Sequence, residues 1–243
     1  MKNTHWYLFL APLVLLAAAA CEDGGTTPLS DSGPVLGTIP WTTPETAMYN
    51  VKQGDTTGTG TLSILAATDS LVFAQRFDIP DNDVTDEITI EVNSETLAPL
   101  KVERVTTDPD FERTCEATYG DATVTVVQKD EDKEHTEEVD VPRAAYDSWS
   151  DLFLWRTLDF ADGYEARYSD VLSCNPRQSE VIAMELEVKG VEQVTVPAGS
   201  FETWHLRVNS GGTTQDAWYA TDGSRVLVKY DNGPQLFELV SVK

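Results

Sequence analysis

Residues 184–208 alternate between apolar and polar side chains, and this pattern constrains the fold more than any other feature of the chain. Leu186 and Val188 are each flanked by charged residues, and the alternation resumes after Gly190. A period of two is that of a β-strand with one face on a core and the other in water. Residues 197–199, Pro-Ala-Gly, predict a turn, because proline fixes φ and glycine allows a positive φ. We therefore expect an antiparallel hairpin, with Gly190 as a bend.

Strand-like runs separated by turn residues cover most of the remaining chain, which predicts an antiparallel meander. These runs are Tyr49–Val51, Gly60–Ala67, Leu71–Phe77, Ile88–Val92, Leu97–Val105, Arg113–Tyr119, Ala122–Val126, Tyr164–Leu172, Val181–Val188, Asp216–Ala220, Arg225–Tyr230 and Gln235–Val242.

The last quarter of the chain also carries a motif of glycine, proline and aromatic residues. It consists of Gly190-x-Glu192-x-Val194-x-Val196-Pro197-Ala198-Gly199-x-Phe201, then Trp218-Tyr219 with Gly223, and a closing Glu238-Leu239-Val240-Ser241. This motif resembles a bacterial envelope family, domain of unknown function 3108. Tyr49-x-Val51-x-x-Gly54 and Leu154-Trp155-Arg156 lie where that family places its first strand and its helix. The resemblance implies a curved sheet similar to the LolA-like half-barrels of lipoprotein carriers, which cradle acyl chains, and it brings no catalytic residues.

One helix is expected, because residues 148–151, Ser-Trp-Ser-Asp, match a capping box and apolar residues follow at helical spacing. We thus expect a mainly β fold: a strongly curved antiparallel sheet, as a half-barrel or open barrel, with one helix across its concave face. The aromatic residues of the helix either belong to a plain core or line an apolar ligand cavity. The candidate lining residues are Trp149, Phe153, Trp155, Trp204 and Trp218.

Residues 1–20 are typical of a secretory signal, with Lys2 before an apolar run that ends in three alanines. Cys21 follows directly, as in a lipoprotein whose cysteine is acylated, although an ordinary signal peptide followed by a chance cysteine gives the same pattern. We expect an exported lipoprotein, anchored by its acyl chains in the outer membrane, on the periplasmic face or at the cell surface.

Residues 21–45 are rich in Gly, Ser, Thr and Pro, which predicts a flexible acidic tether, and residues 46–243 form a single β domain. The net charge of the whole chain is −24, and removal of residues 1–20 makes it one unit more negative because only Lys2 is lost. Such a charge excludes nucleic acid as a partner and disfavours docking on anionic lipid headgroups. Membrane attachment is expected through the acyl chains alone, and the protein is expected to be a monomer.

Cys115 and Cys174 remain once Cys21 is assigned to lipid, and in an exported protein they form either a disulfide or two separate buried thiols. Asp81 and Asp83 are spaced as at the start of a calcium-binding EF-hand loop. However, Asp86 replaces the required glycine, so we expect a polar hairpin loop and no metal site.

The sequence carries none of the glycine, serine, histidine or cysteine motifs of common enzymes, so neither catalysis nor a cofactor is expected. His135 lies in an acidic loop, and His205 is predicted on an outward strand face. Two kinds of function remain. One is a carrier that holds an acyl chain, a lipid or another hydrophobic small molecule in the sheet. The other is a structural or interaction lipoprotein with a filled core that contacts another envelope component.

Overall fold

The computed structural model describes residues 36–130, 133–176 and 178–243, and its strands form one 15-stranded sheet. The strand order is β8-β7-β6-β5-β4-β3-β2-β1-β15-β14-β13-β12-β11-β10-β9. We call β1–β8 the first arm and β9–β15 the second arm. The first arm comprises β1 (Glu45–Gln53), β2 (Thr56–Ala66), β3 (Ser70–Ile79), β4 (Val84–Asn93), β5 (Pro99–Thr107), β6 (Glu112–Tyr119), β7 (Thr123–Asp130) and β8 (Lys133–Asp140). The second arm comprises β9 (Tyr146–Asp147), β10 (Glu165–Leu172), β11 (Glu180–Val196), β12 (Gly199–Ser210), β13 (Thr213–Ala220), β14 (Leu227–Asp231) and β15 (Gln235–Val242).

The helical elements are short. Within the described residues they are α1 (Asp151–Leu154) and three 3₁₀ turns, η1 (Pro80–Asn82), η2 (Ser148–Ser150) and η3 (Trp155–Thr157). We call residues 148–157, which join η2, α1 and η3, the helical segment.

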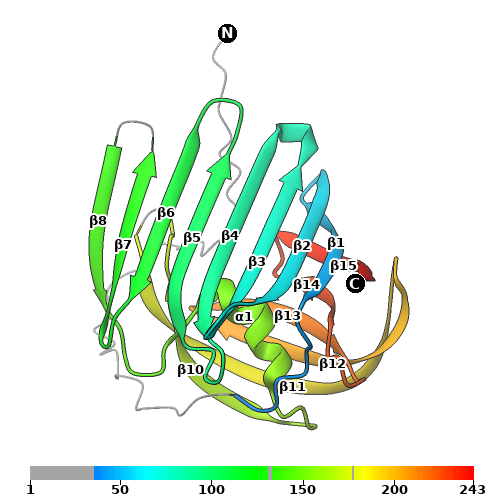
Figure 1. Ribbon diagram of the computed structural model, residues 1–243. Helices are drawn as coiled ribbons and strands as arrows, with labels where there is room; N and C mark the ends of the chain where they lie inside the picture. Colours follow the sequence, from blue (N-terminus) through cyan, green and yellow to red (C-terminus); the bar gives the residue numbers. More distant parts are fainter. Residues whose placement is uncertain (1–35, 131–132, 177) are drawn as a thin grey trace, which may run out of the picture.

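Neighbouring strands are antiparallel throughout, except for the parallel pair of β9 and β10. The first and last strands, β1 and β15, pair in the middle of the sheet, so the chain completes one arm before it starts the other. Figure 1 shows the strands of the first arm at a steep angle to β10–β12 of the second, with α1 between them. The prediction of a mainly β, antiparallel fold with one helix is confirmed.

The predicted strongly curved half-barrel or open barrel is corrected by the structure. The sheet is neither closed nor strongly curled, because β8 and β9 stand at its two ends and do not pair with each other. The interior is formed instead where the two arms face each other. Phe77 of β3 packs on Phe237 of β15 with 5.3 Å between ring centroids, and the Tyr49 hydroxyl donates to the Leu227 carbonyl. The helical segment fills the space between the arms.

The long hairpin of β11 and β12 follows the predicted pattern. Met184, Leu186 and Val188 are buried, and the strands turn between Val196 and Gly199. The pairing register shifts between Val188 and Gly190, where Gly190 has a φ of 121°. Residues other than glycine rarely adopt this backbone conformation, so Gly190 allows the β-bulge to form. The predicted bend and turn are confirmed.

The helical segment contacts both arms. The ring of Phe153 stacks on Phe73 of β3, with 4.5 Å between centroids, and the Tyr219 hydroxyl of β13 donates to the Leu152 carbonyl. Its first turn is capped by Asp147, whose side chain accepts a hydrogen bond from the Trp149 amide. The predicted capping box at residues 148–151 is therefore wrong by one residue at its start, and the α-helix is only four residues long.

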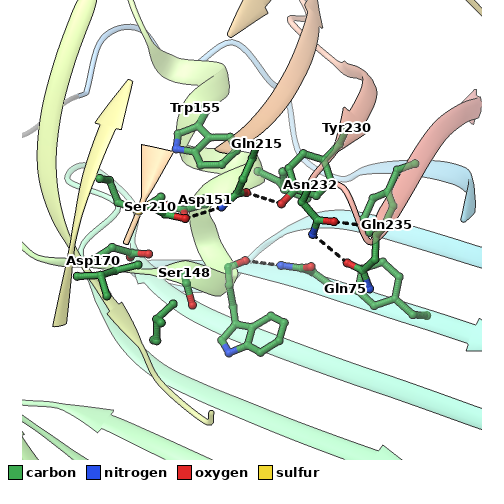
Figure 2. Close-up of a pocket in the computed structure, with 17 residues that line it drawn as sticks. Gln75, Ser148, Asp151, Trp155, Asp170, Ser210, Gln215, Tyr230, Asn232 and Gln235 are labelled. Atoms are coloured by element: carbon green, nitrogen blue, oxygen red, sulfur yellow. Dashed lines mark hydrogen bonds between the residues drawn. The ribbon is translucent and has the colours of Figure 1, made fainter. Parts of the chain in front are cut away.

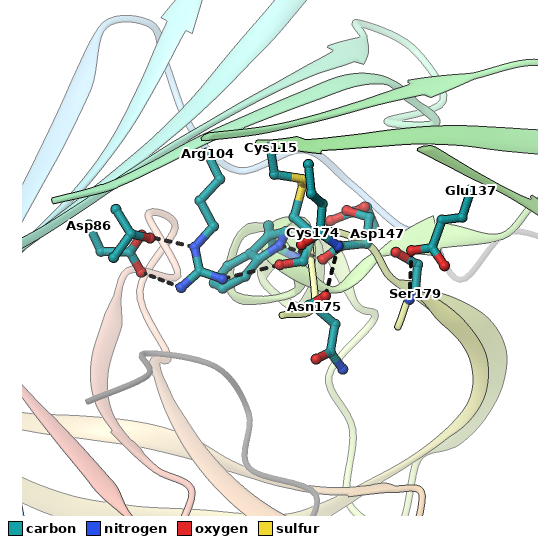
Figure 3. The surroundings of a disulfide bond; sticks show 12 residues. Asp86, Arg104, Cys115, Glu137, Asp147, Cys174, Asn175 and Ser179 are labelled. Atoms are coloured by element: carbon teal, nitrogen blue, oxygen red, sulfur yellow. Dashed lines mark hydrogen bonds and ion pairs between the residues drawn. A yellow bond between two sulfur atoms is a disulfide. The ribbon is translucent and has the colours of Figure 1, made fainter. Parts of the chain in front are cut away.

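A disulfide joins the arms, and an arginine that forms a buried ion pair within the first arm also donates a hydrogen bond across to the second (Figure 3). Cys115 of β6 is bonded to Cys174, which follows β10, so the disulfide alternative predicted from the sequence is confirmed. Arg104 of β5 donates to both carboxylate oxygens of Asp86 at 2.9 and 2.8 Å, and also to the Cys174 carbonyl. The prediction that Asp86 belongs to a polar hairpin loop is therefore wrong, because Asp86 lies on β4 with its side chain in the core.

The N-terminal part of the described chain is packed on the domain. Trp41 is buried, its ring meets Phe73 edge-on at 5.8 Å, and the Arg156 guanidinium lies over it. Gly37 lies so close to Thr157 that a Cβ atom there would come within 2.3 Å of the carbonyl oxygen. The tether predicted for residues 21–45 therefore cannot extend through residues 36–45, which belong to the domain. The predicted signal at residues 1–20 and the lipidation of Cys21 lie outside the described residues.

Candidate functional site

A cavity of about 70 Å³ lies between the helical segment and the second arm, with β3 of the first arm on its other side (Figure 2). Its walls combine aromatic and aliphatic side chains with amides, serines and two carboxylates. They comprise Gln75, Phe77, Ser148, Trp149, Asp151, Leu152, Trp155, Asp170, Leu172, Ile182, Met184, Ser210, Gln215, Tyr230, Asn232, Gln235 and Phe237. The alternation of the strands explains this arrangement, because each strand that reaches the cavity contributes residues of its inward face.

Most polar groups in the wall satisfy one another. The Tyr230 hydroxyl donates to the Gln215 carbonyl oxygen, and the Gln215 amide donates to Ser210 Oγ at 2.8 Å. Asn232 pairs with Gln235 through a side-chain bond of 3.2 Å and a backbone amide at 2.8 Å. These bonds satisfy groups whose burial without partners would be costly, and they fix the shape of this wall.

Three buried aspartates gather at the opposite wall. Asp151 and Asp170 line the cavity, and Asp147 lies behind them; each side chain is at most 6% exposed. Tyr168 donates to Asp151 at 2.5 Å and accepts a hydrogen bond from the Trp155 indole at 2.9 Å. The chain of Trp155, Tyr168 and Asp151 therefore holds one carboxylate in place.

The environment raises the pKa of all three carboxyl groups. Burial raises the pKa of Asp147 to about 6, although hydrogen bonds from Ser173, Tyr119 and the Trp149 amide oppose the shift. The pKa values of Asp151 and Asp170 lie well above the usual range, first because of burial and then because of the negative charges of neighbouring carboxylates.

Asp170 differs from the other two aspartates in its surroundings. Its side chain is completely buried, and in the described part of the chain no hydrogen bond of normal geometry reaches either carboxylate oxygen. Within the same residues, none of the three aspartates forms a salt bridge with arginine or lysine. The neighbour that can share a proton with Asp170 is Asp151. The carboxyl groups of the cavity wall thus have no positively charged partner among the described residues.

The structure places the five candidate lining residues in three different environments. Trp149 and Trp155 line the cavity, and Phe153 is buried on the other side of α1, against Phe73. Trp204 is half-buried at the margin of the core, where it stacks on Phe160 at 5.9 Å. Trp218 lies on the outer face of the second arm, so the prediction that it lines the interior is wrong.

The outer face around Trp218 carries a small polar cluster. His205 stacks on Trp218 at 4.8 Å and is hydrogen-bonded to Asp216 at 2.7 Å. Lys229 Nζ lies over the Trp218 ring, 4.6 Å from its centroid, and Glu192 accepts a hydrogen bond from the Trp218 indole. The outward position of His205, predicted from the strand alternation, is confirmed.

Sequence reasoning missed the three aspartates. A signal for Asp170 exists, because Tyr168, Asp170 and Leu172 share one phase of the β10 alternation and face inward together. An acidic residue at a strand position whose neighbours two residues away are apolar and face the core indicates a buried carboxylate. Asp147 and Asp151 have no such signal, since one precedes the short helical segment and the other lies within it, and the chain contains 41 acidic residues.

Residues 36–130, 133–176 and 178–243 lack two further features that would point to function. Across these ranges, no group of three or more His, Cys, Asp and Glu side chains is arranged to hold a metal ion. The same ranges contain no helix that is long and apolar enough to cross a membrane.

Comparison with known proteins identifies the family. A family model described as "Protein of unknown function (DUF3108)" matches residues 46–235. The chain belongs to this family. The resemblance inferred from the glycine, proline and aromatic motif is therefore confirmed, and the DUF3108 match includes every residue of the cavity wall except Phe237. No curated protein matches the chain.

A solved structure shows a similar fold. The chain is similar to the crystal structure of a β-barrel-like protein of domain of unknown function DUF1849 from Brucella abortus. The TM-score is 0.54 and the sequence identity 12%, and the match covers 86% of this chain and 98% of that chain. At this identity the likeness concerns the fold alone, and function must be argued from the site.

Proposed function

We propose that this DUF3108 domain is an exported binding module that takes a compact small molecule into the cavity between its arms. The observation that carries the proposal is the cavity itself, about 70 Å³ between the arms and lined by aromatic side chains together with Asp151 and Asp170. Sites for small molecules are typically concave, mostly apolar and equipped with a few polar groups that orient the ligand.

The size of the cavity favours a compact ligand over a long one. A water molecule needs about 10–15 Å³ measured in this way, so the cavity has room for roughly five atoms of similar size. Sites for drug-sized ligands are larger, about 300–1,000 Å³. The acyl chain or lipid expected from the resemblance to lipoprotein carriers therefore does not fit, and a compact ligand is proposed in its place.

The proposed activity is binding without catalysis. Among the described residues that line the cavity there is no histidine or cysteine. The alternative is the structural or interaction lipoprotein, and the dense packing of the interior favours it. Trp155, Phe153 and Tyr168 are each at most 2% exposed, so much of the space between the arms is already filled.

The proposed address is the cell envelope. The disulfide between Cys115 and Cys174 fits an oxidising compartment, where such bonds persist. We propose that acyl chains on Cys21 anchor a monomeric protein in the outer membrane. The strongly negative net charge leaves those chains as the means of attachment.

Chemical-shift mapping tests the proposed function. Residues 22–243, which contain the whole described domain, are exported behind a cleavable signal, labelled with ¹⁵N and titrated with butylammonium, 1-butanol and butyrate. We expect saturable shifts from at least one compound, centred on residues 148–155, Asp170 and residues 232–237.

A pair of variants controls this experiment. Ser148 lines the cavity and is only partly exposed, so Ser148→Leu should fill the space and abolish the shifts. Ser94→Leu, in the turn between β4 and β5, makes the same change away from the cavity and should leave them unchanged. If no compound gives saturable shifts, or if the shifts persist in Ser148→Leu, the binding proposal fails and the interaction alternative stands.

A further inference from the structure

The charge of the cavity wall indicates which ligands it can accept. Two carboxyl groups, from Asp151 and Asp170, face the cavity, and among its described lining residues there is no lysine, arginine or histidine. An anionic ligand would bring more negative charge into a buried site, which is costly at low effective dielectric. A cation would supply the positive charge that the protein lacks there.

The aromatic residues of the wall are suited to the same class of ligand. Five of the lining residues are aromatic, and they surround the cavity from both arms and from the helical segment: Phe77, Trp149, Trp155, Tyr230 and Phe237. The face of an aromatic ring carries partial negative charge and attracts organic cations, most strongly when water is excluded. Carboxylates beside aromatic rings can therefore bind the charge and the carbon atoms of an ammonium ion together.

Asp170 supplies an independent reason to expect a ligand. The amides and hydroxyls of Gln215, Tyr230, Asn232 and Gln235 are hydrogen-bonded within the wall, as described above. Asp170 is completely buried, yet among the described residues no donor reaches its carboxylate oxygens with normal hydrogen-bond geometry, and the neighbour that can share a proton with it is another carboxyl group, that of Asp151. A buried carboxylate without donors is rare, because its desolvation is then uncompensated. The donors that it lacks can come from a bound molecule.

We propose that the cavity binds a compact organic ammonium ion, with its nitrogen against Asp170 and Asp151 and its carbon atoms against Trp155 and Phe237. This proposal rests on the binding function proposed above and names its ligand class. The N–H groups of the ion donate to Asp170, and its positive charge replaces the proton that the two carboxyl groups otherwise share. Figure 2 shows Asp151, Asp170 and Trp155 together at one side of the cavity.

Isothermal titration calorimetry tests the ligand class. Butylammonium, 1-butanol and butyrate have nearly the same size, so their affinities report the effect of charge. A charge-assisted hydrogen bond contributes about 1.5–3 kcal/mol, so butylammonium should bind at least about 10-fold more tightly than 1-butanol. Butyrate should bind more weakly than either. Equal affinities of butylammonium and 1-butanol would overturn the ammonium assignment and leave the binding function intact, whereas no binding of any compound would overturn both.

The variant Asp170→Asn tests the role of the unpartnered carboxylate. It keeps the shape of the side chain and removes its charge, and we expect it to lower the affinity for butylammonium at least about 10-fold while changing that for 1-butanol by less than about 3-fold. Ser94→Leu serves as the control and should alter neither. An unchanged affinity for butylammonium in folded Asp170→Asn would contradict the proposal. If this variant does not fold, the comparison of the three compounds on the unmodified chain still decides the question.

Discussion

Removal of Arg104 should be among the most destabilising single changes in this protein. The guanidinium forms two hydrogen bonds to Asp86 at 2.9 and 2.8 Å, donates to the Cys174 carbonyl, and lies 4.6 Å from the ring centroid of Trp149. The side chains of Arg104 and Asp86 are 5% and 0% exposed. Thr106 donates a further bond to Asp86 at 2.9 Å. Arg104→Met would leave the buried carboxylate with this single side-chain donor.

The expected magnitude follows from the asymmetry of buried ion pairs. Loss of one partner leaves an uncompensated charge in the core and typically costs about 3–5 kcal/mol, whereas replacement of both partners by apolar residues is often close to neutral. We therefore expect Arg104→Met to lower the free energy of unfolding by about 4 kcal/mol, and Arg104→Met with Asp86→Leu to recover most of that loss.

Urea unfolding followed by tryptophan fluorescence, with the disulfide intact, gives the free energies for this double-mutant cycle. Arg167→Met is the matched control, because its ion pair with Glu185 is exposed and should contribute less than about 1 kcal/mol. A loss below about 1 kcal/mol in Arg104→Met, or equal losses in the single and double variants, would refute the reasoning.

Three further outcomes are expected. Replacement of Cys115 and Cys174 by serine opens a loop of 59 residues and should cost about 4 kcal/mol on the chain-entropy model, measured by urea unfolding; a cost near zero would contradict the view that this bond fixes the arms. Burial raises the pKa of Asp147 from 3.8 to about 6, so the folded state holds its proton more tightly and the free energy of unfolding falls as the pH rises from about 4 to 6. Asp147→Asn should remove about 3 kcal/mol of that fall, and unfolding curves with the same pH dependence in both proteins would count against it. Trp218→Ala, on the outer face, should cost about 1 kcal/mol and leave ligand binding intact, whereas the buried Trp155→Ala should cost about 3–5 kcal/mol; comparable thermal shifts for the two would be inconsistent with these positions.

Strand alternation predicted the fold wherever one face of a strand is apolar and the other charged. Leu186 and Val188 illustrate this, since a shift of the strand pairing by one residue would expose both side chains to water. The same reasoning fails for residues 217–220, Ala-Trp-Tyr-Ala, because four consecutive apolar residues do not show which of them face the core. The structure resolves the phase, with Tyr219 inside and Trp218 outside.

The buried charges could be predicted only in part. Asp86 shares a phase with Ile88 and Ile90, which places its carboxylate inside, and Arg104 shares one with Val102 on the neighbouring strand. These two phases indicate buried groups of opposite charge on neighbouring strands, a signal that the assignment of Asp86 to a polar hairpin loop overlooked. The cavity could not be predicted, because it depends on how the helical segment of residues 148–157 lies between the arms, and that contact is set by tertiary packing.

A crystal structure of residues 22–243 soaked in butylammonium tests the central claim most directly. The account predicts density for the ion in the cavity, with its nitrogen within hydrogen-bonding distance of Asp170 and its carbon chain against Trp155. The same soak of Ser148→Leu should leave the cavity filled by the leucine alone. Density for the ion only on the outer face of the sheet, or a cavity occupied by water under saturating butylammonium, would contradict it.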